Sequence, residues 1–125
     1  MLCAMHAKIS HSLHKKDLLL KYQEQKQQKR LLQERALAEA RRVAMVLAEE
    51  YQAQKVYLFG PLSYGEFREG MSIELAAAGM PHDRFAAALA FVKQEEEPTI
   101  ELVGLGQVDA WTRRNIVQKG MVLAG

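Results

Sequence analysis

The sequence predicts a two-layer α/β (α+β) domain with a small mixed sheet and a long amino-terminal helix. Residues 15–54 contain neither Pro nor Gly and consist mostly of the strongest helix formers. The residues that follow alternate short β-rich runs with amphipathic helical segments, as expected for helices packed on a sheet. A chain of 125 residues suits one domain with one modest core. With 49% apolar and 26% charged residues, the composition is that of an ordinary globular protein.

The long helix has two parts of different character. Its second part carries an apolar stripe at spacings near four and seven, which predicts packing on a core. The preceding run KYQEQKQQKR has no such stripe. We therefore expect residues 1–30 to form a helical extension or a partly disordered tail, and residues 31–125 to form the domain. The stripe consists of Leu32, Ala36, Val43, Leu47 and Tyr51.

The order of the remaining elements follows from β-rich runs, helical periodicity and Gly or Pro breakers. Each predicted strand is short and stops at or near a glycine. Pro81 suits the first position of a helix, and Lys119 followed by Gly120 suits the end of one. The predicted elements are a strand at 55–59, a strand at 72–78, a helix at 81–94, a strand at 99–105, a helix at 108–120 and a short edge strand at 121–123.

A glycine-containing loop, LFGPLSYGEFREGMSIEL, joins the first two strands. The motif positions are Gly60, Gly65, Glu66, Arg68, Ile73 and Glu74, with Glu101 in the middle of the third strand. In order and spacing this stretch resembles a minimal nucleotidyltransferase domain of the DNA polymerase β superfamily. That signature is an apolar strand, Gly-Ser or Gly-Gly, a glycine-containing loop, Asp-apolar-Asp, and a third acidic residue on a later strand. The resemblance covers about residues 32–123.

The resemblance implies a two-metal site for nucleotidyl transfer. Two divalent cations would hold the triphosphate of ATP and lower the pKa of the attacking hydroxyl, and Mg²⁺ takes carboxylate ligands. Alternate residues of a strand point to the same face, so Asp-x-Asp presents two carboxylates side by side. Carried over residue by residue, Glu74 and Glu101 are the catalytic and metal-binding candidates. The nucleotide-binding candidates are Gly60, Pro61, Gly65, Arg68 and Ser72.

Two positions depart from the signature. Ser72 stands where the first, metal-bridging aspartate is expected, and a hydroxyl removes one negative charge from between two dications. Unit charges about 4 Å apart interact by roughly 4 kcal/mol at an effective dielectric near 20. Pro61 stands where a phosphate-binding serine is expected, and it has neither a side-chain donor nor a backbone N–H. The loop carboxylates Glu66 and Glu69 are the only nearby replacements that the sequence offers.

The two departures predict a catalytically inactive protein that acts by binding a partner, in an antitoxin-like or regulatory role. The resemblance implies a HEPN-type helical protein as that partner, since such pairs form toxin–antitoxin systems. A homodimer through the amino-terminal helix is a further expectation. The alternative is an active enzyme that uses Mg²⁺ to transfer AMP from ATP to a protein or small-molecule hydroxyl. If the protein is inactive, no cofactor is expected.

The charge distribution and the remaining residues limit which other classes of protein are possible. Residues 1–55 hold eleven Lys/Arg and six Asp/Glu, a net +5, whereas residues 56–125 hold six and nine, a net −3. A basic extension that binds nucleic acid is a third hypothesis, which is disfavoured because Tyr22 is the only aromatic residue within that extension. Cys3 stands alone, which excludes a disulfide framework and favours the cytoplasm. No run is apolar enough to span a membrane. We expect Trp111 to be in the core or at an interface.

Overall fold

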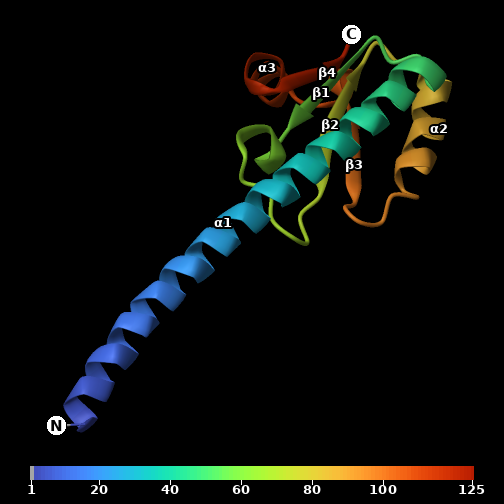
Figure 1. Cartoon of the computed structure of the whole chain (residues 1–125). Coiled ribbons are helices and arrows are strands. Elements are labelled where there is room, and N and C mark those ends of the chain that lie inside the picture. Colours follow the sequence, from blue (N-terminus) through green and yellow to red (C-terminus); the bar gives the residue numbers. More distant parts are fainter. Residues whose placement is uncertain (1) are drawn as a thin grey trace. The chain divides into compact units, whose positions relative to one another are not determined.

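The computed structural model describes the backbone of residues 2–125 and the side chains of residues 15–125. The fold is a mixed α+β fold with a four-stranded sheet and a long amino-terminal helix, which confirms the predicted class (Figure 1). By its contacts the chain divides into two compact units, Met1–Leu31 and Leu32–Gly125. The elements are α1 (Leu2–Glu50), β1 (Lys55–Phe59), η1 (Pro61–Tyr64), β2 (Ile73–Ala78), α2 (His82–Val92), β3 (Ile100–Gly104), η2 (Leu105–Gln107), α3 (Ala110–Lys119) and β4 (Met121–Ala124).

The first unit is part of α1. Every side chain from residue 15 to residue 30 is exposed, including Leu18, Leu19, Leu20 and Tyr22. The side chain of Cys3 lies outside the described residues. A separate functional role for residues 1–30 stays a prediction.

The sheet of the second unit has the strand order β3-β2-β1-β4. β1 pairs antiparallel with β2 on one side and with β4 on the other. β2 and β3 are parallel, and α2 forms the crossover between them. A parallel pair needs such a crossover because its strands cannot be joined by a tight turn. The sheet therefore has two edge strands, β3 and β4.

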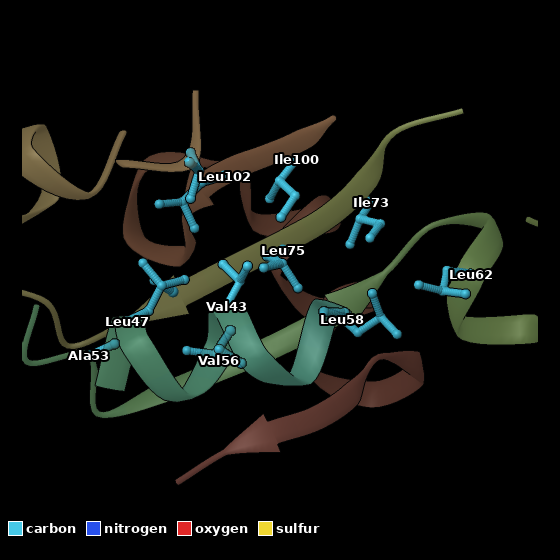
Figure 2. Packing of buried hydrophobic residues seen from close by; sticks show 14 of the residues in the cluster. Val43, Leu47, Ala53, Val56, Leu58, Leu62, Ile73, Leu75, Ile100 and Leu102 are labelled. Atoms are coloured by element: carbon cyan, nitrogen blue, oxygen red, sulfur yellow. The ribbon is translucent and has the colours of Figure 1, made fainter. Parts of the chain in front are cut away.

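One face of the sheet is covered by residues 32–50 of α1 and by α2, which together enclose the main core (Figure 2). Val43 and Leu47 of α1 are fully buried. They pack in one core with inward-pointing residues of β1, β2 and β3, among them Leu58, Leu75 and Leu102. The predicted stripe is confirmed, with Leu32 and Tyr51 at its ends only partly buried. Burial of this apolar stripe holds the second part of α1 on the sheet.

The opposite face of the sheet has a smaller cluster of Tyr57, Ala76 and Ile116, the last from α3. Tyr57 and Ala76 lie on this face because alternate residues of a strand point to opposite sides. α3 begins after Asp109, whose side chain accepts a 2.7 Å hydrogen bond from the backbone N–H of Thr112. Such an N-cap satisfies one of the free N–H groups at the start of a helix.

The predicted strands and helices all exist, with ends that differ by a few residues. α1 ends at Glu50, within the segment 15–54 that lacks Pro and Gly, and α2 ends at Val92 instead of residue 94. Of the two places expected for Trp111, the core is wrong, because Trp111 is 73% exposed on α3, and a place at an interface stays a prediction. Within the described residues, no helix is both long enough and apolar enough to cross a membrane.

Candidate functional site

The two predicted carboxylates are brought together in the sheet. Glu74 of β2 and Glu101 of β3 are direct partners in the parallel register, and Glu74 also lies opposite Phe59 of β1. Alternation along β2 places Glu74 on the same face as Ala76, which is the face with α3. Glu101 is exposed and Glu74 is partly buried. The site is therefore a pair of carboxylates beside the point where β1 ends.

Gly60, the residue that ends β1, lies directly against the Glu74 carboxylate. Its φ is +75°, a conformation that strongly favours glycine. A Cβ at this position would overlap Oε2 of Glu74. The predicted glycine is thus required both by the backbone turn and by the close approach of a carboxylate. In this structure the glycine leaves room for Glu74. In the nucleotidyltransferase domains that the motif resembles, the glycine at this position would leave room for a triphosphate.

This environment shifts the pKa of the Glu74 carboxyl. Burial raises its pKa, since a charged carboxylate loses solvation there, and the negative charge of Glu101 raises it further. A magnesium ion or a neighbouring arginine would shift the pKa of a carboxyl in the opposite direction. Among the described residues, no cationic side chain forms an ion pair with Glu74.

Ser72 is the residue before β2, and its hydroxyl partner is Thr99, the residue before the neighbouring strand β3. Its Oγ lies 2.9 Å from Oγ1 of Thr99, so one hydroxyl donates to the other. The backbone supports this pairing, because the N–H of Ile73 donates to the carbonyl of Thr99 at 2.8 Å. At the position of the expected bridging carboxylate there is therefore a neutral pair of hydroxyls. Thr99 was not among the predicted site residues, although its position two residues before Glu101 mirrors that of Ser72 before Glu74.

The loop after Gly60 has its polar groups turned onto its own backbone. Pro61 begins the short helix η1. The hydroxyl of Ser63 donates to the carbonyl of Gly60 at 2.6 Å, and the N–H of Ser63 donates to the same oxygen at 3.0 Å. Ser63, which the sequence analysis did not single out, is the serine nearest to the missing phosphate-binding position. Its hydroxyl is already used to close the turn.

The other predicted nucleotide-binding residues lie elsewhere on the loop. Gly65 ends η1 in the left-handed conformation, with φ +77°. Arg68 is exposed in the segment between η1 and β2, and its N–H lies 3.4 Å from the sulfur of Met71. Within the described residues, no ion pair or hydrogen bond joins Arg68 to Glu74 or Glu101. Contact of these residues with a nucleotide stays a prediction.

The donor set does not fit a pair of magnesium ions. Within the residues that the structure describes, no group of three or more His, Cys, Asp or Glu side chains is placed to hold a metal. Glu66 and Glu69, the candidate replacements, are exposed on the loop. Two-metal transfer uses a carboxylate between the cations, and here Ser72 faces Thr99 instead. We derive no reaction step through a metal at this site.

No protein-family model matches the chain, and no curated protein is significantly similar to it. Among solved structures, the fold is similar to that of a chain in the crystal structure of a toxin-antitoxin with AMP-PNP. The TM-score is 0.57 at 19% sequence identity, and the aligned part covers 68% of this chain and 73% of that chain. At this identity the likeness shows a similar fold and no more.

Proposed function

We propose that this protein is a nucleotidyltransferase-like domain that no longer transfers nucleotides and acts by binding a protein partner, in an antitoxin-like or regulatory role. The observation that carries the proposal is the hydroxyl pair of Ser72 and Thr99 at the metal-bridging position. Neutral hydroxyls do not replace the charge that draws two dications together.

The solved structure with a similar fold supports the partner-binding half of the proposal. It is the crystal structure of a toxin-antitoxin with AMP-PNP. By this likeness and the resemblance of the motif, we propose a helical partner of the HEPN type. Trp111 is a suitable contact residue, because an exposed tryptophan buries a large area on binding and tryptophan is enriched at interface hot spots. Val117 of the same helix is also exposed.

A comparison of variants tests the loss of the metal site. The variant Pro61→Ser/Ser72→Asp restores both missing groups, and each single variant serves as its control. We expect Mg²⁺-dependent binding of ATP in calorimetry for the double variant and none for the wild type. Binding by the wild type, equal to that of the double variant, would contradict the proposal.

The partner half is tested by co-expression with the protein that the neighbouring reading frame encodes. We expect a complex that survives size-exclusion chromatography and that is weakened by Trp111→Ala. Tyr64→Ala is the matched control, because Tyr64 is similarly exposed but lies on η1. A complex that forms only with ATP and Mg²⁺ would instead favour the alternative, an active transferase that modifies its partner. The AMP-PNP in the similar structure is the reason to include nucleotide in this experiment.

A further inference from the structure

The second unit has a groove of about 930 Å³ between α1, the loop before β2 and the turn before β3. Thr99, whose hydroxyl pairs with that of Ser72, is one of its lining residues, whereas Glu74 and Glu101 are not. Its walls include the apolar side chains of Leu32, Phe67, Met71 and Pro98. Phe67 is almost fully buried and forms the bottom of the groove. A groove of this kind can accept apolar side chains from a helix that lies along it.

Carboxylates dominate the charge around this groove. Four glutamates line it against one cationic side chain, that of Arg35. Glu39 is neutralised in part by Arg42, with which it forms an ion pair at 2.5 Å. The other three glutamates are exposed and carry the net negative charge of the rim. They are Glu69, Glu96 and Glu97. An occupant should therefore combine apolar side chains with several positive charges.

The amino-terminal unit of the same chain has that chemistry. From residue 15 to residue 30 it holds six Lys/Arg and two Asp/Glu, a net charge of +4. At about 100° per residue, Lys15, Leu19, Tyr22 and Lys26 fall within about 60° of one another on the helix. Leu19 and Tyr22 are 62% and 63% exposed, so large apolar side chains on this face have no cover.

The acidic residues of this segment lie away from that face. Asp17 and Glu24 are both about 180° from Lys15 on the helix. Lysines within the apolar stripe also disfavour pairing of two such helices through it, because like charges would then meet across the seam. The face suits an acidic apolar groove better than it suits a copy of itself.

We propose that two copies of this chain associate reciprocally, with the basic apolar face of residues 15–30 of each copy docked in the acidic groove of the other. Reciprocal docking gives a closed dimer with two-fold symmetry, since each copy offers both a helix and a groove. Leu19 and Tyr22 enter the groove above Phe67, and Lys15 and Lys26 lie beside the carboxylates of its rim. The proposal is independent of whether the carboxylate pair on the other face of the sheet retains any activity.

Charge reversal on each side tests the proposal with the full chain. One variant reverses the helix, Lys15→Glu/Lys26→Glu, and the other reverses the groove, Glu96→Lys/Glu97→Lys. Sedimentation equilibrium should show a dimer for the wild type and an increase of about tenfold or more in the dimer dissociation constant for each variant. Glu49→Lys/Glu50→Lys is the control, because these two glutamates are exposed on α1 but do not line the groove. Circular dichroism of each variant verifies that it is folded.

Mixing the two reversed variants is the decisive arm. In the mixed dimer each helix meets a groove of opposite charge, so dimers should reappear only in the mixture. A monomeric wild type would overturn the proposal. So would a dimer that the groove reversal leaves intact, which would indicate pairing between helices, or a mixture that stays monomeric after both single reversals have abolished the dimer.

Discussion

The carboxylate of Glu74 occupies the space that a side chain at Gly60 would need. Glu74 lies on β2 and Gly60 ends β1, so the turn after one strand is fitted to a residue of the next. The contact connects the motif glycine with the surviving acidic residue of the site.

Gly60→Ala should destabilise the domain more than Gly65→Ala does. Both glycines have a positive φ near +75°. Gly65 is in the left-handed α conformation, where alanine has a backbone strain of about 1–2 kcal/mol, whereas Gly60, with ψ −166°, is in a region that essentially only glycine adopts. A Cβ at Gly65 has no neighbouring atom within 4 Å, whereas a Cβ at Gly60 displaces Glu74. Urea denaturation of the two variants measures the difference. Adding Glu74→Ala to Gly60→Ala should recover the part of the excess loss that the overlap with Glu74 causes, and no recovery would contradict the contact.

Glu74→Gln should make the protein more stable at neutral pH and flatten its pH dependence. The folded-state pKa of Glu74 is raised above its unfolded-state pKa. The contribution of the protonated Glu74 to the free energy of unfolding is therefore fully present below the unfolded-state pKa and is lost as the pH rises through the folded-state pKa. Above that interval the buried charge opposes folding. Unfolding midpoints measured from acid to neutral pH should fall with rising pH for the wild type more steeply than for Glu74→Gln.

Glu101→Gln is the control for this pH effect. It removes the smaller of the two causes, the neighbouring charge, and leaves the burial of Glu74 unchanged. The slope should therefore be reduced only in part. Equal slopes in the wild type and Glu74→Gln would show that Glu74 is not responsible.

Gln33→Leu should destabilise the loop before β2. The side-chain amide of Gln33 on α1 donates to the carbonyl of Phe67 and accepts from the N–H of Phe67 at 3.0 Å. Phe67 is a core residue, so loss of both partners leaves buried backbone groups unpaired, at about 1–3 kcal/mol. Urea denaturation measures the cost. Gln118→Leu, at an exposed position on α3, should cost far less, and a similar cost for both would contradict the assignment.

Much of the fold was predictable from local patterns. The stripe from Ala36 to Leu47 predicts a buried helix face, and β1 begins and ends as predicted because Gly60 stops it. Asp109 and Gly120 bracket α3. The sequence left Trp111 between the core and an interface, because apolar character alone does not tell a core residue from an exposed one on a short amphipathic helix; the structure excludes the core. Its neighbour on the inner face, Ile116, is the one that packs on the sheet.

The candidate site was predictable as a set of positions but not as a set of contacts. The spacing of Glu74 and Glu101 predicts two carboxylates on adjacent strands, and the register brings them side by side. The partnership of Ser72 with Thr99 depends on a parallel register between segments 27 residues apart, which no local pattern encodes. The two hydrogen bonds between the Gln33 side chain and the Phe67 backbone likewise depend on packing between α1 and the loop.

A calorimetric titration of the wild-type protein with ATP in the presence of Mg²⁺ tests the central claim most directly. With Ser72 and Thr99 paired where a bridging anion would be required, we predict no saturable heat that depends on the metal. Saturable binding of ATP that appears with Mg²⁺ and vanishes with a chelator would contradict the account.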